Sequence, residues 1–123
     1  MEPEDRESRD SAYIWDMLDA ALAILDFIEG ADFDAYLEDR KLQLAVERAL
    51  EIMGEAARNV SIDLQLKHPE IPWKGIIAQR NVLAHNYGAI KQDLIWEVLT
   101  VHLPDLVDRL KQIIPEQSLS EDF

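Results

Sequence analysis

The chain has 123 residues, a length that suits a single domain able to bury a sizeable core. It contains no cysteine, which excludes disulfides and thiolate zinc sites, and its net charge of −13 argues against a broad nucleic-acid-binding groove. The N-terminus is acidic and no apolar run approaches the roughly 18 residues of a membrane-spanning helix, so we expect a cytoplasmic protein that does not enter the membrane.

Composition divides the chain into three parts. Residues 1–10 are charged and poor in apolar side chains, which is typical of a disordered acidic N-terminus. Residues 11–114 have helical periodicity throughout and form the predicted helical domain. Residues 115–123 are expected to be a flexible acidic tail.

The first helix is predicted to begin at Ser11 and to end before Gly30. Its main apolar stripe recurs at spacings of three and four: Ile14, Met17, Leu18, Ala21, Leu25 and Ile28. Trp15 and Leu22, seven residues apart, form a second stripe on another face. A helix that is apolar on two faces is either deeply buried or shared between chains.

Asp32 and Asp34 can each cap a helix, which predicts a short helix ahead of a longer one from about residue 40 to residue 60. Gly54 inside a helix costs about 0.5–1 kcal/mol relative to alanine, so its presence indicates close approach by another helix. Glu55 is either a partner for Arg80 or a solvated surface glutamate. The apolar stripe of the longer helix predicts its buried face: Leu42, Ala45, Val46, Ala49, Ile52, Met53, Ala56 and Val60.

Residues 61–71 are expected to form a long connection, and His68, which precedes a proline, is expected to be an exposed loop residue. Pro72 suits the first position of the next helix, whose apolar stripe runs from Trp73 to Tyr87. Arg80 lies within that stripe. Burying an unpaired cation costs several kcal/mol, so Arg80 must reach water, an acid or a phosphate.

The last helix is predicted to begin at Lys91 or Gln92. Pro104 removes one backbone donor and clashes with the carbonyl of Thr100, so we expect a kink there. His102 is interpreted as a packing or surface residue. Strand patterns are almost absent, and the predicted fold class is all-α: an up-and-down four-helix bundle with an additional short helix, dimerising through a helical face.

A polar cluster stands where the helical pattern after Pro72 runs into Gly88: Arg80, Asn81, His85, Asn86 and Tyr87. Arginine presents a planar fork of donors that suits a phosphate, and histidine exchanges a proton near neutral pH. Cleavage of RNA through its own 2′-hydroxyl needs a proton acceptor, a proton donor and positive charge on the phosphorane, and in principle no metal. Arg80 and His85 are therefore candidate catalytic residues.

One histidine per chain is one too few for this chemistry, and a two-fold homodimer with the motif at its interface would supply the second. On an unbroken helix, positions 80 and 85 lie about 140° apart around the axis. The helix can stop near His85, since Asn86 and Gly88 tolerate the left-handed conformation that ends helices. Alternatively, Arg80 meets the His85 of a second chain.

Charge is distributed unevenly along the chain. Residues 1–39 hold 13 acids and two arginines, for a net charge of −11, whereas residues 71–92 hold three cations and no acid. The candidate site therefore lies in an acid-free window. The overall acidity still predicts weak, local contact with RNA.

The spacing of Arg80, His85 and Tyr87 resembles the signature of the HepT-like toxins of the HEPN superfamily. Further blocks occur in the family's order, and the resemblance covers about residues 12–114. The blocks are ERALEIMGEAA at residues 47–57, HPEIPW at residues 68–73 and LPDL at residues 103–106.

This resemblance implies an all-helical, HEPN-like dimer that acts as a metal-independent ribonuclease toxin without a cofactor. It also implies an antitoxin, an MntA-like nucleotidyltransferase that blocks the toxin by adding AMP to the motif tyrosine. By position, Arg80 and His85 would form the catalytic pair and Tyr87 would be the modified residue. Apart from the resemblance, the predicted supporting residues are Asn81, Asn86 and Glu55.

This chain departs from the family pattern at Asn86, where glycine is common, and at Gly88-Ala89, where a larger residue is common. It also lacks a glycine-rich phosphate loop, and its three histidines lack metal-ligand spacing, so no metal is expected. The expected partners are RNA, the antitoxin and a second copy or higher oligomer. Two alternatives remain: a non-catalytic module that docks a nucleotidyltransferase, and a scaffold in which Arg80 forms a structural ion pair.

Overall fold

The computed structural model describes the backbone of residues 3–85 and 88–117, and the side chains of residues 9–79 and 91–114. All regular secondary structure in these ranges is helical, which confirms the predicted all-α class. None of the helices in the described ranges has both the length and the apolar character needed to span a membrane.

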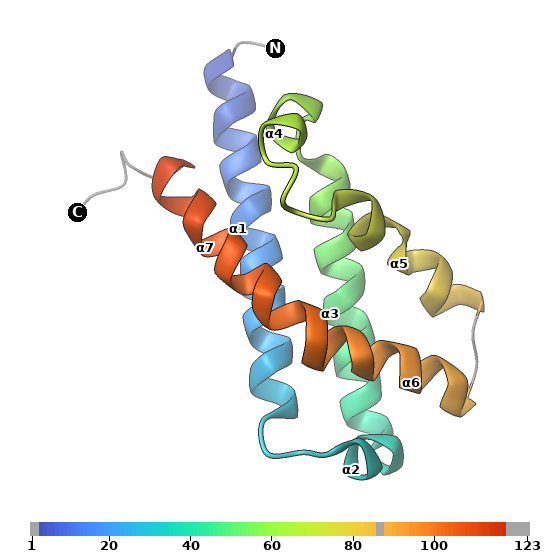
Figure 1. Ribbon diagram of the computed structural model, residues 1–123. Coiled ribbons are helices and arrows are strands. Elements are labelled where there is room, and N and C mark those ends of the chain that lie inside the picture. Colours follow the sequence, from blue (N-terminus) through green and yellow to red (C-terminus); the bar gives the residue numbers. More distant parts are fainter. Residues whose placement is uncertain (1–2, 86–87, 118–123) are drawn as a thin grey trace.

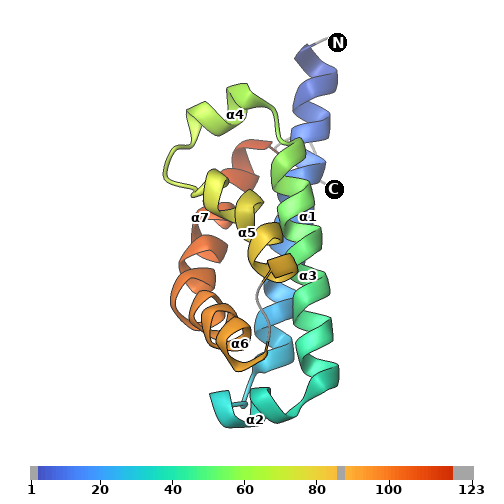
Figure 2. The same ribbon diagram turned by 90° about the vertical axis from the view of Figure 1, so that its right-hand side faces the viewer.

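Two long antiparallel helices form the centre of the bundle. They are α1 (Pro3–Ile28) and α3 (Arg40–Asn59), and they lie side by side in Figures 1 and 2. The start and end of α3 agree with the predicted helix to within one residue. The helix α5 (Trp73–His85) packs against α3 and completes this part of the bundle.

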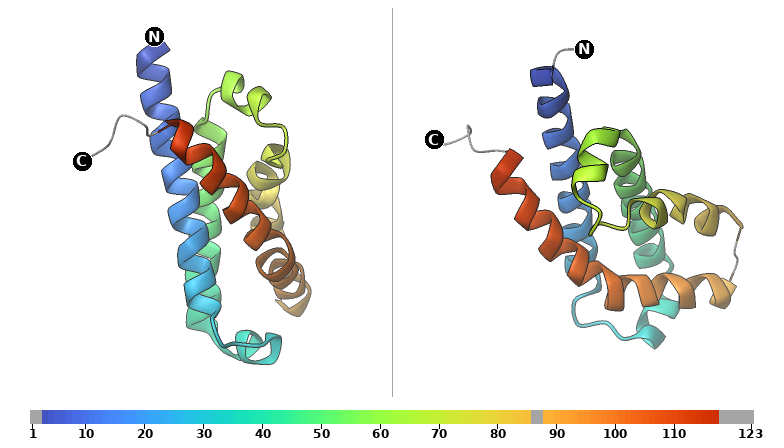
Figure 3. Two further views of the ribbon diagram at one scale, coloured as in Figure 1. Left: turned by 60° about the vertical axis from the view of Figure 1, so that its left-hand side comes forward. Right: turned by 45° about the horizontal axis from the view of Figure 1, so that its top comes forward.

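The fourth helix of the bundle is a bent rod made of α6 (Gly88–Glu97), the π-helical segment η1 (Val98–His102) and α7 (Leu103–Gln117). The rod changes direction at η1 (Figure 3), and α7 packs against α1. Pro104 explains the bend, because a proline cannot follow a regular helical turn without a clash. The Leu103 N–H bonds to the Val98 carbonyl, so the turn before the proline is widened, and the predicted kink is confirmed.

The short helix α2 (Phe33–Glu38) is capped by Asp32, whose carboxylate accepts a hydrogen bond from the Ala35 N–H at 2.8 Å. Asp39 caps α3 in the same way and accepts from the Leu42 N–H at 3.0 Å. These caps confirm the predicted short helix before a longer one. They also fix the sharp turn at the lower end of the molecule in Figure 1, where α2 joins α3.

A second short helix, α4 (Ile62–Lys67), occupies the segment that was predicted to be a long connection, so that prediction was wrong. The Ser61 hydroxyl caps this helix by accepting from the Leu64 N–H at 3.2 Å, and Leu64 is buried. One cap and one buried leucine therefore suffice to stabilise a turn and a half of helix within a stretch that ends at a proline.

His68 is buried, so the prediction of an exposed loop residue was also wrong. Its carbonyl accepts the Trp73 indole N–H at 2.9 Å, and its Nδ1 lies 3.0 Å from the Glu70 carboxylate. The backbone N–H and the His68 imidazole that bond to this carboxylate lower the pKa of Glu70. The loop before α5 is thus folded onto the start of α5.

The first helix begins at Pro3, ahead of the predicted start at Ser11. Asp10 is buried, and its carboxylate accepts from the Ser61 backbone N–H at 2.8 Å and from the Ser61 hydroxyl at 2.6 Å. This tertiary contact joins α1 to the start of α4. The other end of α1 agrees with the prediction, because Gly30 follows it with a positive φ of 80°.

Candidate functional site

The motif helix α5 ends at His85, as one of the two sequence alternatives predicted. The helix is continuous from position 80 to position 85, so these positions lie about 140° apart around its axis. Ending the helix at His85 therefore does not bring the two positions onto one face. Five predicted site residues lie outside the described side chains or backbone: Arg80, Asn81, His85, Asn86 and Tyr87.

Close backbone contact holds α5 against α3. A Cβ atom built on Gly54 would lie only 3.2 Å from the Ile76 carbonyl oxygen, so glycine is what allows the two helices to approach this closely. Ile76 and Trp73 of α5 are buried, and the carbonyl of Pro72, which precedes the helix, accepts the Ile76 N–H. The predicted close approach at Gly54 is confirmed, and its partner is the motif helix.

A buried hydrogen-bond network holds the start of α6. The Tyr36 hydroxyl donates to the Gln92 amide oxygen at 2.5 Å, and the Gln92 amide nitrogen donates to Glu47 at 3.0 Å. The Lys91 ammonium donates to the other Glu47 oxygen at 3.1 Å. We call Tyr36, Glu47, Lys91 and Gln92 the α6 clamp.

The clamp joins α2, α3 and α6 in the protein interior. Burial, and then the Glu47 carboxylate, raises the pKa of Tyr36 above its ordinary range, so its hydroxyl remains a donor at any physiological pH. Lys91 and Glu47 are only 15% and 16% exposed, so their charges stabilise each other with little screening by water. This network was not predicted from the sequence, because its members lie far apart in the chain and resemble ordinary surface residues.

Lys91 therefore cannot count toward a positive surface for RNA. Its charge is offset by Glu47, which lies outside the acid-free window in the sequence but beside Lys91 in the fold. Residues 71–92 contain two lysines with described side chains, and of these Lys74 is the exposed one. The sum of charges over residues 71–92 overstated the positive field near the motif.

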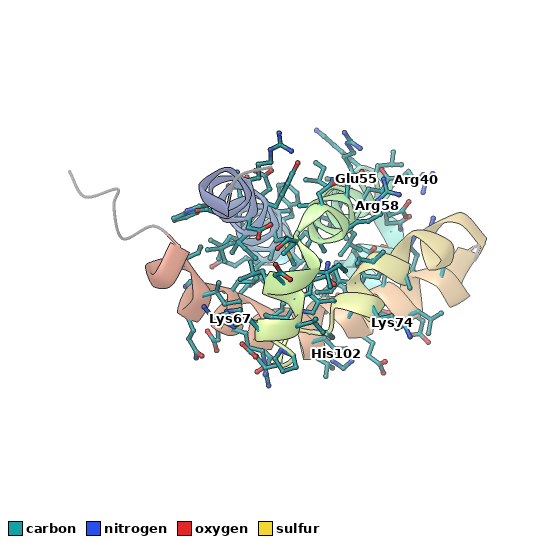
Figure 4. All side chains as sticks on the ribbon, turned by 90° about the horizontal axis from the view of Figure 1, so that it is seen from above. Arg40, Glu55, Arg58, Lys67, Lys74 and His102 are labelled. Carbon is teal, nitrogen blue, oxygen red and sulfur yellow. The ribbon has the colours of Figure 1, made fainter. Side chains whose placement is uncertain are left out.

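Glu55, predicted to support Arg80, lies on the exposed side of α3. Its carboxylate accepts from Arg58 at 2.9 Å in an i,i+3 pair. Figure 4 shows Glu55 and Arg58 together on one side of α3, and Lys74 and His102 on the opposite side of the molecule. The pairing of Glu55 with Arg80 stays a prediction.

A mostly apolar groove of about 320 Å³ separates α5 from the bent rod. Gly75, Ile76 and Gln79 line it from α5, and Leu103 and His102 line it from the rod. The Gln79 amide oxygen is buried there and has no hydrogen-bond partner among the described residues. This groove has no signature in the sequence, because residues of η1 and α5 that are distant in the chain form it together.

A model of the family described as ribonuclease HepT-like matches residues 17–113. The chain belongs to this family. The matched span includes α5, the α6 clamp and most of the bent rod. The match to the family therefore extends over the fold and is not confined to the motif.

Two relatives are similar to this chain over most of their length. A Methanocaldococcus jannaschii protein named as a candidate RNase is 36% identical over 105 residues, which cover 85% of this chain and 87% of that protein. A Thermococcus cleftensis protein named "Probable ribonuclease HepT" is 35% identical over 101 residues, covering 82% and 92%. No solved structure matches the chain significantly.

The predicted motif spans the end of α5 and the start of α6. Within the described ranges, no group of three histidine, aspartate or glutamate side chains is arranged to hold a metal ion. The described residues hold the two helices in place. Gly54 allows α5 to pack closely against α3, and the α6 clamp holds α6 through hydrogen bonds. The two helices on either side of residues 86–87 are thus both fixed to α3, directly or through the clamp.

Proposed function

We propose that this protein is the toxin of a type VII HepT/MntA-like toxin–antitoxin system and acts in the cytoplasm as a metal-independent endoribonuclease. The observation that carries this proposal is membership of the ribonuclease HepT-like family over a span that includes Arg80 and His85. The relative named "Probable ribonuclease HepT" supports the same activity.

In the proposed reaction, one His85 imidazole removes the proton from a ribose 2′-hydroxyl. The 2′-oxygen then forms a bond to the adjacent phosphorus while the bond from phosphorus to the 5′-oxygen breaks. A protonated His85 imidazole supplies the proton for the leaving 5′-oxygen, and Arg80 offsets the negative charge of the phosphorane. The products are a 2′,3′-cyclic phosphate and a 5′-hydroxyl.

This reaction needs two imidazoles in one cleft, so we propose a homodimer in which both chains contribute. Two-fold dimers are the commonest oligomers and place equivalent residues around one axis. The backbone of α5 supports this arrangement, because positions 80 and 85 of a single helix lie on different faces. A site shared between chains does not require one chain to bring both side chains together.

We further propose that an MntA-like nucleotidyltransferase neutralises the toxin by transferring AMP from ATP to the Tyr87 hydroxyl oxygen, which breaks the bond between the α- and β-phosphates and releases pyrophosphate. An AMP group two residues from His85 would put a bulky phosphodiester beside the proposed catalytic residues and occupy the place of the RNA phosphate. Intact-mass analysis after incubation with ATP and the genomic neighbour that encodes such an enzyme tests this. We expect the wild-type chain to gain the mass of one AMP. An adduct that persists in Tyr87→Phe would contradict modification of Tyr87.

The test of the nuclease uses purified protein, RNA and EDTA. We expect cleavage with 2′,3′-cyclic phosphate ends. His85→Ala should lose about 10²–10⁴-fold in rate, the usual size of an acid–base contribution. Arg80→Ala should lose about 10²–10³-fold, the usual size of an electrostatic contribution to the transition state. His102→Ala is the matched control, because His102 is exposed on η1 outside the motif, and it should cleave like the wild type. Folding of each variant is checked by thermal melting. Full activity in folded Arg80→Ala and His85→Ala would reject the proposal.

A further inference from the structure

The outer side of α1 carries an alternating stripe of apolar and acidic residues. Trp15, Asp19, Leu22 and Asp26 follow one another at spacings of four, three and four, so they share one side of the helix, and Asp16 adjoins them. We call these five residues the α1 face. Trp15 is 44% exposed and Leu22 is 41% exposed.

No element of the described fold covers the α1 face. The helix packs against α3 and α7 through its other sides, and it lies at the edge of the molecule when seen along the bundle in Figure 4. Beside it, a groove of about 360 Å³ runs between α1 and α3, lined by Tyr13 and Asp16 from α1 and by Ile52 and Glu55 from α3. Of the five residues, Asp16 alone lines this groove, so the groove borders the α1 face on one side.

The acids of this face lack cationic partners within the described part of the chain. None of Asp16, Asp19 and Asp26 forms an ion pair there, and residues 10–39 contain no lysine or arginine. Arg48, which lines the groove, is already paired with Glu51 at 3.4 Å. Asp26 also lies in the last turn of α1, where the helix dipole disfavours an acid. These acids therefore do little for the stability of the isolated fold.

We propose that the α1 face binds a cationic amphipathic segment of a partner protein. Arginine or lysine side chains of the segment would pair with the three aspartates, and its apolar side chains would cover Trp15 and Leu22. A guanidinium can also stack on the exposed indole of Trp15, an attraction that strengthens when the pair is shielded from water. The acidic side chains and the exposed apolar side chains of the α1 face thus both favour a segment that is cationic and amphipathic.

Other occupants fit this surface less well. A second copy docked face to face would place six aspartates in one interface, and residues 10–39 offer no lysine or arginine to pair with them, which disfavours that interface. RNA and anionic membranes would be repelled by the same carboxylates. A small cation would leave Trp15 and Leu22 exposed. The inference does not depend on the proposed nuclease activity, since it uses neither Arg80 nor His85.

The test measures binding of a synthetic helical peptide that presents arginines and leucines on one face, by calorimetry at moderate salt. We expect the triple variant Asp16→Asn, Asp19→Asn, Asp26→Asn to bind at least about tenfold more weakly than the wild type. A peptide with glutamates in place of the arginines should not bind. The control variant Asp34→Asn, Leu66→Ser changes one exposed acid and one exposed leucine on α2 and α4 and should bind like the wild type.

Two results would overturn the proposal. Equal affinity of the arginine peptide for the wild type and the folded triple variant would show that the peptide binds elsewhere. Because the chain has no cysteine, Leu22→Cys introduces a single thiol at the centre of the face. An interchain disulfide through that thiol within a native dimer would assign the face to a second copy instead.

Discussion

Charged residues serve different purposes on the two sides of this molecule. On the α1 face, Asp16, Asp19 and Asp26 are exposed and form no ion pair with described residues. On the side of α5 and α6, Lys91 and Glu47 are paired in the interior, where they hold α6 in place. The difference shows that summing charges over a stretch of sequence does not predict the charge at the surface, because some charged side chains form ion pairs inside the fold.

The comparison predicts that removing a clamp charge destabilises the fold far more than removing a surface charge. Glu47→Leu leaves the Lys91 ammonium and the Gln92 amide without their acceptor, and we expect a loss of about 3 kcal/mol in the free energy of unfolding. Glu51→Gln, on the same helix, breaks an exposed pair with Arg48 and should cost no more than about 0.5 kcal/mol. Denaturant unfolding of both variants measures the two losses, and equal losses would contradict the distinction.

A matched pair of lysine substitutions separates local charge near the motif from net charge. Lys74 is exposed on α5 and Lys67 is exposed on α4, so changing either to glutamate alters the net charge equally. We expect Lys74→Glu to raise the KM for RNA about threefold to tenfold at low salt, with a smaller effect as salt increases. Lys67→Glu should change the KM less. Identical effects of the two variants would show that only the total charge matters.

Two glycines test how tightly α5 is held against α3. A Cβ atom on Gly54 would meet the Ile76 carbonyl at 3.2 Å, whereas one on Gly75 would meet nothing within 4 Å. Gly75→Ala should stabilise the protein by about 0.5–1 kcal/mol, because alanine has less backbone freedom to lose on folding. Gly54→Ala should be less stable than Gly75→Ala by about 1 kcal/mol, measured by thermal unfolding. A Gly54→Ala variant more stable than Gly75→Ala would mean that α5 can move away from α3 at little cost.

The smallest expected effect is at Glu70, between α4 and α5. Its pKa is lowered in the folded protein, so the stabilisation is present at neutral pH and is lost as the pH falls through the lowered pKa. Glu70→Gln should therefore reduce the melting temperature slightly near pH 7. The difference from the wild type should vanish at acidic pH, and a difference that grows as the pH falls would contradict this sign.

The sequence predicted the features of the fold that depend on neighbouring residues. The cap at Asp32, the end of α1 before Gly30 and the bend before Pro104 all follow from local backbone chemistry, whereas the cap at Asp39 was not predicted. The stretch after residue 60 misled the prediction, because Pro69 made it resemble a loop. Its helix depends on tertiary contacts, including the hydrogen bonds from Ser61 to Asp10.

The site was less predictable than the fold. The motif and the contact at Gly54 could be found from residue types and spacing, and the end of α5 at His85 agrees with one sequence alternative. The α6 clamp could not, because Tyr36 and Gln92 lie 56 residues apart and neither has a distinctive local pattern. Similarly, nothing near Lys91 in the sequence indicates that an acid from α3 neutralises it.

The most direct test of the proposed shared site mixes wild-type chains with increasing amounts of His85→Ala chains, allows them to exchange into dimers, and measures RNA cleavage. If each cleft needs an imidazole from both chains, mixed dimers are inactive, and activity per total chain should follow the square of the wild-type fraction. Activity that falls in direct proportion to the wild-type fraction would show that one chain suffices, which would contradict the account.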